Sequence, residues 1–159
     1  MSANSKLTVA THVLVWMELS RRLGRDLVTS EQIAESVNTN PVVIRRCLGE
    51  LRKAGFVDAK RGSGAGWFLL VEPDAVTLED VFRAVDPGPV LGLHHTQPNQ
   101  ECPVGSGIRP TLQRVYDDLE DTMRRRLART TLADVLKDIL AQQDGRDPSA
   151  LVNAATHTD

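Results

Sequence analysis

The chain has 159 residues, a length that suits one domain with an appended element. Its formal net charge of −2 and its pI of about 6.1 exclude a nucleic-acid-binding protein that is basic over its whole length, although a local basic surface remains compatible with them. There is no apolar run long enough to span a bilayer and no recognisable signal peptide, so we expect a cytoplasmic protein with no membrane partner.

The first predicted element is an amphipathic helix over residues 6–22. Its apolar side chains recur at helical spacing and should pack inside the domain. They are Leu7, Ala10, Val13, Leu14, Met17 and Leu19. Gly24 ends this helix, and Thr29 or Ser30 can then cap a second, short helix. Its apolar face consists of Ile33, Ala34 and Val37.

A third helix is predicted after a tight turn. Residues 38–40 have turn composition, Asn-Thr-Asn, and Pro41 suits the first position of a helix. The i, i+4, i+7 spacing of its apolar residues indicates one inward face, made by Ile44, Leu48 and Leu51. Gly55 is predicted to end the helix as a C′ glycine.

A β-hairpin is predicted next. Residues 56–57 and 67–71 favour two short strands, and the glycine-rich loop 61–66 between them begins with Arg61. Helix, tight turn, helix and hairpin form the order of a winged helix-turn-helix domain. The predicted fold is therefore mainly α with a small β-wing, and residues 6–86 form its DNA-binding domain.

Positive charge is concentrated in this segment. Between residues 45 and 61 there are six basic and two acidic residues. A helix fits the major groove of DNA, arginine can fork onto guanine, and a glycine-rich wing can approach phosphates. We therefore predict double-stranded DNA as the partner. The alternative is that these are ordinary solvated charges on a small α+β domain.

The chain after the wing is predicted to continue with a short helix over residues 77–86, capped by Thr77. The Pro-Gly-Pro sequence at 87–89 cannot be helical. Residues 90–93 could form a short extended strand, and residues 94–107 have the composition of a polar loop, so 87–107 is predicted as a loop region.

The longest predicted helix starts at Ile108 or Pro110, runs to about Arg129, and is followed by another over residues 132–142. One apolar stripe marks the long helix: Leu112, Val115, Leu119, Met123 and Leu127. We predict that residues 108–142 dimerise through this stripe, and a two-fold homodimer would bind a near-palindromic operator. The alternative is that the helix folds back on its own domain. Residues 143–159 are predicted to be a flexible tail.

Of the two cysteines in the chain, Cys102 lies just before the long helix. A thiol near a helix N-terminus or a histidine has a lowered pKa and reacts faster with oxidants. The sequence is compatible with two roles for Cys102, a redox or electrophile sensor and an inert, partly buried thiol. Cys47 lies between Ile44 and Leu48 and is predicted to be a packing residue.

A metal or catalytic centre is not predicted. His94, His95 and Cys102 could hold zinc, but no C-x-x-C pair supports such a site. A conventional iron–sulfur cluster needs about three or four thiolates, so we expect no cofactor. A thiol enzyme, such as a small peroxidase, would need a resolving cysteine that no motif supplies.

The stretch SEQIAESVNTNPVVIRRCLGELRKAGFVDAKRGSGAGWFLL resembles the DNA-binding half of the Rrf2 family, the IscR, NsrR and CymR type of bacterial regulator. The wing RGSGAGWFL is similar to that family's RGPGGGYxL, and TLEDVFRAVD and RRLARTTLADVL resemble its later helices. The similarity covers roughly residues 7–140. VNTNPVVIRR and CPVG are most similar to the YwnA-like branch, which includes thiol-based stress repressors.

This resemblance implies a homodimer with a winged helix-turn-helix, whose long helices cross at the interface. The function that we expect is a homodimeric repressor, with oxidation or electrophile modification of Cys102 as its candidate switch. The resemblance places base contacts on Val42, Arg45 and Arg46. It places minor-groove and phosphate contacts on the wing, at Arg61 and Gly62. The full predicted DNA-binding set is Thr29, Ser30, Asn40, Val42, Arg45, Arg46, Arg52, Lys53, Arg61, Gly62 and Ser63. Cluster-binding members carry three spaced cysteines where this chain has only Cys102. The alternative function is an iron–sulfur or metal-dependent regulator with an unusual ligand set, shared between subunits and using His12 or a glutamate.

Overall fold

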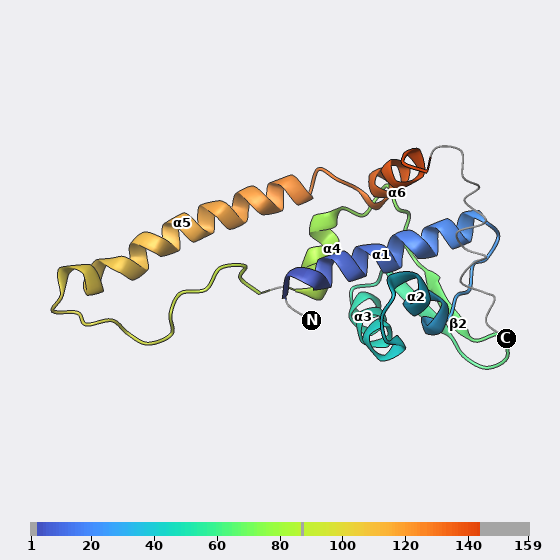
Figure 1. Cartoon of the computed structure of the whole chain (residues 1–159), viewed down its shortest axis with the longest axis horizontal. Coiled ribbons are helices and arrows are strands. Elements are labelled where there is room, and N and C mark those ends of the chain that lie inside the picture. Colours follow the sequence, from blue (N-terminus) through green and yellow to red (C-terminus); the bar gives the residue numbers. More distant parts are fainter. Residues whose placement is uncertain (1–2, 87, 144–159) are drawn as a thin grey trace.

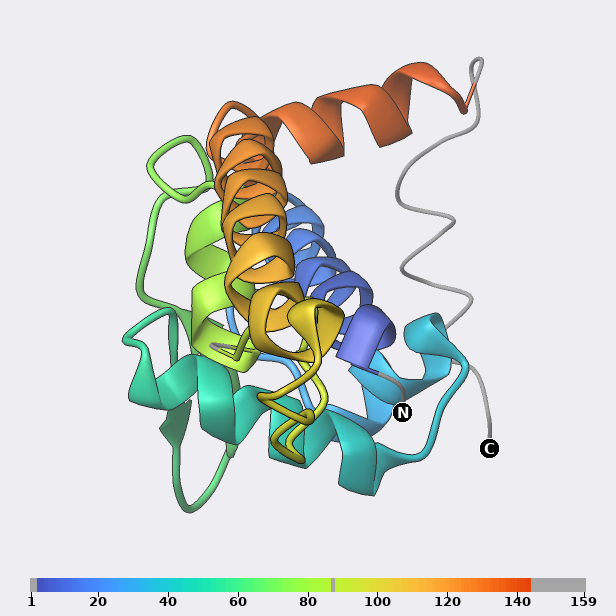
Figure 2. The same ribbon diagram turned by 90° about the vertical axis from the view of Figure 1, so that its left-hand side faces the viewer.

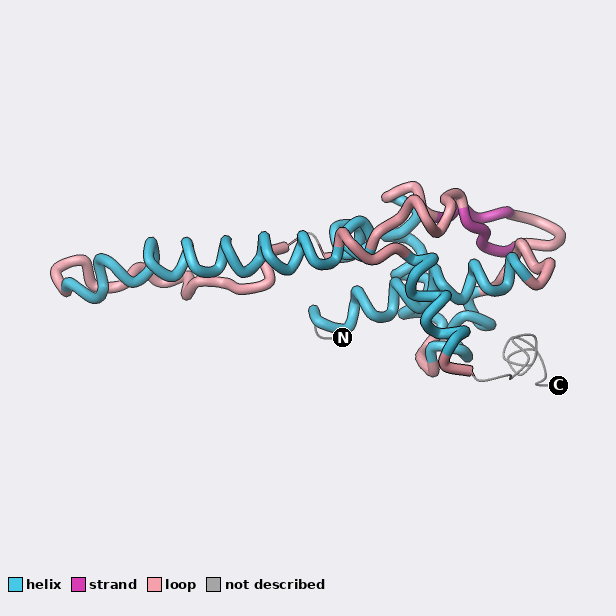
Figure 3. Tube along the Cα trace, turned by 90° about the horizontal axis from the view of Figure 1, so that it is seen from above, coloured by secondary structure: helices cyan, strands magenta, loops and turns pink. Residues whose placement is uncertain are grey.

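The computed structural model describes residues 3–86 and 88–143, which form a mainly helical fold with one small antiparallel sheet, as predicted. The elements in chain order are α1 (Ala3–Arg22), α2 (Ser30–Val37), α3 (Pro41–Lys53), β1 (Val57–Lys60), β2 (Gly66–Leu69), α4 (Leu78–Val85), α5 (Pro103–Leu127) and α6 (Leu132–Ala141). Apart from its first residue, the predicted tail at 143–159 lies outside the described residues. α5 projects away from the other elements (Figures 1 and 3).

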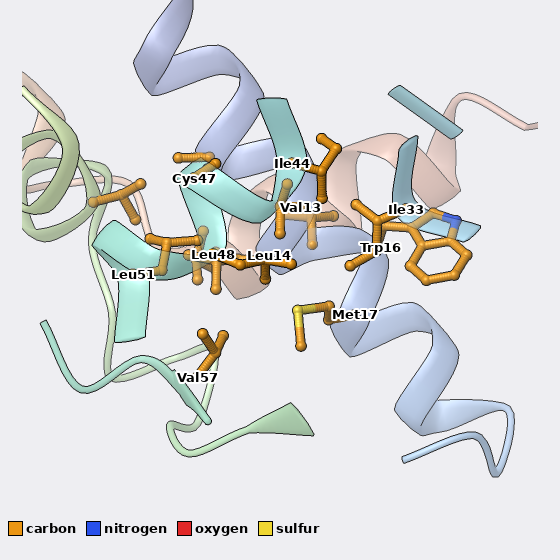
Figure 4. Close-up of a cluster of buried hydrophobic side chains, with 14 of the residues drawn as sticks. Val13, Leu14, Trp16, Met17, Ile33, Ile44, Cys47, Leu48, Leu51 and Val57 are labelled. Atoms are coloured by element: carbon orange, nitrogen blue, oxygen red, sulfur yellow. The ribbon is translucent and has the colours of Figure 1, made fainter. Parts of the chain in front are cut away.

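α1 is the helix on which the other elements pack. It contacts α2, α3, α4, α6 and β2, and every residue from Val13 to Ser20 is buried. α2 and α3 lie on one side of α1 and α6 lies on the other (Figures 1 and 2). The core that results is mainly aliphatic (Figure 4). Its labelled members are Val13, Leu14, Trp16, Met17, Ile33, Ile44, Cys47, Leu48, Leu51 and Val57.

The helix-turn-helix is defined by two side-chain caps. The Thr29 hydroxyl accepts from the backbone N–H of Gln32 at 3.2 Å, and the Gln32 side chain accepts from the N–H of Thr29 at 2.9 Å. This capping box makes Thr29, and not Ser30, the N-cap of α2. Asn40 caps α3 by accepting from Val42 N–H at 2.8 Å, with Pro41 in the first turn as predicted.

The wing is an antiparallel hairpin with Val57 opposite Leu69 and Lys60 opposite Gly66. β1 runs three residues beyond the predicted pair at 56–57, because the ladder also pairs Asp58, Ala59 and Lys60 with β2. Val28 adds an isolated bridge to Trp67, with N–O distances of 3.0 and 2.7 Å. A β-carbon on Gly66 would lie 3.1 Å from the Val28 carbonyl oxygen, so this close approach favours glycine.

α5 begins at Pro103, earlier than the predicted start at Ile108 or Pro110. Both prolines suit a first turn, but the helix forms at the first one, and Pro110 lies inside it at the cost of one backbone hydrogen bond. Gly105 is needed in this turn, because a β-carbon there would collide with the Asn99 carbonyl oxygen. The predicted loop region is therefore five residues shorter at its C-terminal end.

The strand predicted at 90–93 does not form in the described structure. A strand needs a partner edge for its backbone groups. The N–H of Val90 instead donates to the Glu120 carboxylate on α5 at 3.4 Å, and the segment runs beside α5 (Figures 1 and 3).

α6 packs against the winged domain of its own chain. Leu132 and Leu136 are 2% and 1% exposed in the core formed with α1. Leu78 N–H donates to Thr130 C=O and Leu132 N–H donates to Val76 C=O, both at 2.9 Å. This face of residues 132–141 is therefore covered within one chain, and dimerisation through residues 108–142 stays a prediction.

Truncation of the most enclosed α1 side chain should test this core. Leu14 is fully buried, so Leu14→Ala should lower the free energy of unfolding by about 2–5 kcal/mol through lost burial and a residual cavity. Leu70→Ala is the control, since this leucine is 54% exposed and its loss should change the free energy by less than about 0.5 kcal/mol. Equal urea midpoints for the two variants would contradict the assigned core.

Candidate nucleic-acid interface

The N-terminal half of α3 presents a polar and basic outer face. Val42 is 57% exposed, and Arg45 and Arg46 are exposed beside it. The opposite face of the helix holds Ile44 and Leu48, which are 0% exposed. The spacing that buries the apolar residues therefore leaves the three predicted base-contacting side chains directed outward, at the end of the helix that can enter a major groove.

Arg45 is tied to the preceding helix. Its Nη1 donates to Oε1 of Glu31 at 2.9 Å, and the two side chains are 52% and 60% exposed. Hydrogen bonds lower the pKa of Glu31, first from its own backbone N–H and then from Ser30, and the charge of Arg45 acts in the same direction. Glu31 is therefore ionised near neutral pH. The contact joins residues 14 positions apart, and sequence reasoning missed it.

The remaining predicted cations of α3 fall into two classes. Arg46 and Lys53 are exposed and make no ion pair within the described part of the chain. Arg52 instead pairs with Asp58 of β1 at 2.7 Å, at the end of α3 away from the outer face formed by Val42 and Arg45. Arg52 therefore links α3 to the wing.

The wing loop lies entirely on the surface. Residues 61–65, including the predicted Arg61, Gly62 and Ser63, are all exposed. Gly62 and Gly64 have φ values of 87° and 69°, a backbone conformation that few other residues adopt. Lys60 is exposed at the end of β1 and adds a cation that the predicted contact set left out.

Three other predicted contacts have structural roles. Ser30 is 6% exposed and its hydroxyl donates to Glu31 at 3.1 Å, so its side chain is not available to a DNA surface in this conformation. The side-chain oxygens of Thr29 and Asn40 accept hydrogen bonds as helix caps. These two residues lie at the edge of the candidate interface, and Ser30 lies behind it.

The two cysteines have opposite environments. Cys102 is exposed at the N-cap position of α5, where the backbone N–H groups of Gly105 and Val104 lower the pKa of its thiol. Cys47 is 5% exposed in the core, and burial raises the pKa of its thiol to about 12, with a smaller contribution from Glu50. The packing role predicted for Cys47 is confirmed, and Cys102 is not the partly buried thiol of the inert interpretation.

The exposure of the apolar stripe changes along the length of α5. Val115 and Leu119 are 49% and 51% exposed, whereas Leu112, Met123 and Leu127 are half-buried. The last two line a cavity of about 200 Å³ together with side chains of α1 and α4. The middle of the helix therefore keeps an uncovered apolar face, while its C-terminal end packs on the winged domain.

One ion-pair cluster sets the junction between α4 and α5. Arg124 donates to Glu79 at 3.0 Å and to Glu120 at 2.7 Å, and its guanidinium lies 5.2 Å from the centre of the Phe82 ring. Glu79 is 6% exposed, and these donors offset the cost of burying its carboxylate.

The histidines and the helices of the described residues bear on metal binding and on membrane insertion. Within residues 3–86 and 88–143, no group of three or more His, Cys, Asp or Glu side chains is arranged to hold a metal ion. His94 and His95 stack with ring centroids 4.9 Å apart, and His12 lies on α1, where its Nε2 is 2.9 Å from the Ser36 hydroxyl. No helix in the described ranges is long and apolar enough to cross a bilayer.

Comparison with known proteins gives a consistent result. Residues 3–138 match the model of the Rrf2 family, described as iron-dependent transcriptional regulators. YwnA of Bacillus subtilis (strain 168), provisionally named an HTH-type transcriptional regulator, is 36% identical over 136 residues, which cover 86% of this chain and 98% of YwnA.

Solved structures agree with this match. A crystal structure provisionally described as a DNA-binding protein has a TM-score of 0.65 at 34% identity, covering 83% of this chain and 99% of the other. The oxidized form of Staphylococcus aureus CymR has a TM-score of 0.61 at 20% identity, covering 86% and 96%, and shows a shared fold.

Proposed function

Because the chain belongs to the Rrf2 family of transcriptional regulators, we propose that it is a homodimeric repressor that binds a near-palindromic operator. The single observation that carries this proposal is the common outer surface of α3 and the wing. Arg45 and Arg46 are exposed on the first, and Lys60 and Arg61 on the second. Arginine on a helix can fork onto guanine in the major groove, while wing cations neutralise phosphates.

The dimer part of the proposal follows from the uncovered part of α5. Val115 and Leu119 lie on a helix that extends beyond its own domain, where the described chain has no element to bury them (Figure 1). A second copy of the same helix would remove both side chains from water. A two-fold pair of winged domains would then face two half-sites of a near-palindrome.

We predict distinct effects for the base-contacting and phosphate-contacting arginines. Arg45→Ala should cost about 1–3 kcal/mol of specific binding and relax the base preference. Arg61→Ala should weaken specific and random DNA alike and reduce the slope of log affinity against log salt by about one. Both effects can be measured by fluorescence anisotropy on fragments selected from a random library.

Arg129→Ala is the matched control, because it removes an exposed arginine that lies beyond α5 and outside the candidate interface. If the wild-type protein selects no sequence from the library, the proposed function fails. If all three variants bind alike, the assigned DNA surface is wrong.

We predict that a charge on the α5 stripe will separate the subunits. Leu119→Lys should weaken dimerisation by about 2 kcal/mol or more, since a cation would be buried in an apolar contact. Leu70→Lys places the same charge on another exposed leucine, 54% exposed at the end of the wing, and should leave the dimer intact. Sedimentation equilibrium distinguishes these outcomes, and a Leu119→Lys protein that remains as dimeric as the wild type would refute the interface.

We further propose that Cys102 is the switch. Its support is the exposed sulfur at a helix N-terminus, with a lowered thiol pKa, at the start of the helix proposed to dimerise. Its thiolate can attack hydrogen peroxide, so that sulfur is oxidised to a sulfenic acid as the O–O bond breaks and hydroxide leaves. Staphylococcus aureus CymR, which shares the fold, has been solved in an oxidized form.

Peroxide should therefore release DNA from the wild-type protein and not from Cys102→Ser. Because the pKa of Cys102 is lowered, the thiolate is already present below the ordinary cysteine pKa, and the release rate should rise with pH and level off below that value. Cys47→Ser should release DNA like the wild type, since its thiol is buried. Equal release from Cys102→Ser and the wild type would remove the switch and leave the DNA proposal intact.

An iron-dependent mechanism is the second candidate, because the matching family is described by that property. The donor set does not fit a conventional cluster: the whole sequence has two cysteines, and Cys47 is enclosed in the core. We therefore propose regulation without a bound cofactor. Visible absorbance of anaerobically purified protein would decide between the two mechanisms.

A further inference from the structure

We propose that Glu31 is a positioning residue that orients Arg45 toward a guanine, and thereby sets the base preference of α3. This inference rests on the proposed function, since it requires that α3 enters the major groove. It concerns an acidic side chain that would otherwise only repel DNA phosphates from the same surface.

The geometry of the contact leaves the binding edge of Arg45 available. Only Nη1 is used, in a single hydrogen bond of 2.9 Å to Oε1 of Glu31. Within the described chain, the edge formed by Nε and Nη2 makes no hydrogen bond. That edge carries two parallel N–H groups, and these match the O6 and N7 acceptors of guanine.

Glu31 is itself held in place. Its second carboxylate oxygen, Oε2, accepts from the hydroxyl of Ser30 at 3.1 Å, and Ser30 is 6% exposed. The residue lies in the first turn of α2, where the helix dipole favours a negative charge. Two consecutive hydrogen bonds therefore connect the buried hydroxyl of Ser30, the carboxylate of Glu31 and the exposed guanidinium of Arg45.

The physical benefit is a smaller loss of freedom on binding. A half-exposed arginine on a helix has many rotamers, and ordering them on DNA reduces affinity for every sequence. If Glu31 fixes one end of the guanidinium before binding, less rotamer freedom is lost on binding. DNA gains from this only when its acceptors match the free edge of Arg45. Random DNA, which offers phosphates in place of a matched guanine edge, gains less from the orientation.

The competing role is that Glu31 withholds Arg45 from DNA. A competitor would be expected to occupy the fork of the guanidinium, whereas this carboxylate takes one nitrogen and leaves the fork open. The two roles predict different effects on the ratio of specific to random affinity. Removing a competitor raises the affinity for all DNA and does not lower this ratio. Removing a positioning residue lowers it.

The experiment compares Glu31→Gln with Glu35→Gln in the full-length protein. Glu35 is an exposed acid on the same helix and makes no ion pair within the described residues, so its variant removes the same charge without touching Arg45. Each protein is titrated with a fragment selected by the wild type and with random duplex, and its base preference is measured on a library with single substitutions.

We expect Glu31→Gln to lower the ratio of specific to random affinity by about two- to fivefold, the range that an exposed ion pair can supply. The loss should fall on the base pair whose preference Arg45→Ala also flattens. Glu35→Gln should leave the ratio unchanged. In an Arg45→Ala background, Glu31→Gln should have no further effect on the ratio. Glu31→Gln should lower the equilibrium constant of folding by no more than about fivefold, which corresponds to about 1 kcal/mol of unfolding free energy, the amount expected for one exposed ion pair at a helix N-terminus.

An unchanged or increased ratio for Glu31→Gln would overturn the inference, as would a loss that persists without Arg45. If the wild type binds a selected sequence and Glu31→Gln behaves like Glu35→Gln, only this inference fails. If the wild type shows no preference among sequences, the proposed function itself fails.

Discussion

The burial of α1 is the constraint on which the arrangement of this protein depends. Residues 13–20 are buried without interruption, so that helix must be enclosed on several sides at once. α2 and α3 enclose one side, and α6 the other (Figure 2). Glu18 lies within this run at 4% exposure, and Arg21 and Arg22 compensate its charge at 2.8 and 2.7 Å. The angle between α2 and α3, and with it the outer surface of α3, is therefore set by packing against one helix.

The direction of α5 depends on a much smaller contact. Arg124 joins Glu79 of α4 to Glu120 of α5 and covers the ring of Phe82. Both Arg124 and Arg83 donate to the same oxygen of Glu79. If two chains pair through α5, this junction fixes how far apart their α3 helices lie. Under the proposed function, a change at Cys102 would have to act on α3 through α4, which contacts both α5 and α3.

Local signals allowed much of the fold and part of the site to be predicted from the sequence. Helix caps, the proline at the start of α3, Gly55 and the glycine-rich wing act over a few residues, and the structure has them where they were expected. The start of α5 was predicted too late, at Ile108 or Pro110, because Pro103 and Pro110 carry the same local signal and the close approach of Gly105 to Asn99 is a tertiary feature. The face buried by α6 depends on Leu132 meeting α1 across more than a hundred residues. The same limit hid the pair formed by Glu31 and Arg45, which joins two helices and follows no periodicity.

The positive charge of the candidate interface is divided into tethered and untethered cations, and the division has a physical consequence. Arg45 and Arg52 each lie within 2.9 Å of a carboxylate, whereas Arg46, Lys53, Lys60 and Arg61 have no such partner in the described structure. Untethered cations exchange counterions freely and contribute affinity that falls with salt for any sequence. A tethered guanidinium contributes less to that general attraction, because its field is partly cancelled by its carboxylate. Its N–H groups, however, point in a fixed direction, and a fixed direction is required to discriminate between the acceptor patterns of different base pairs. A chain with a net charge of −2 can therefore hold a DNA-binding surface, provided that its acids are placed where they orient arginines and not where they only repel phosphates.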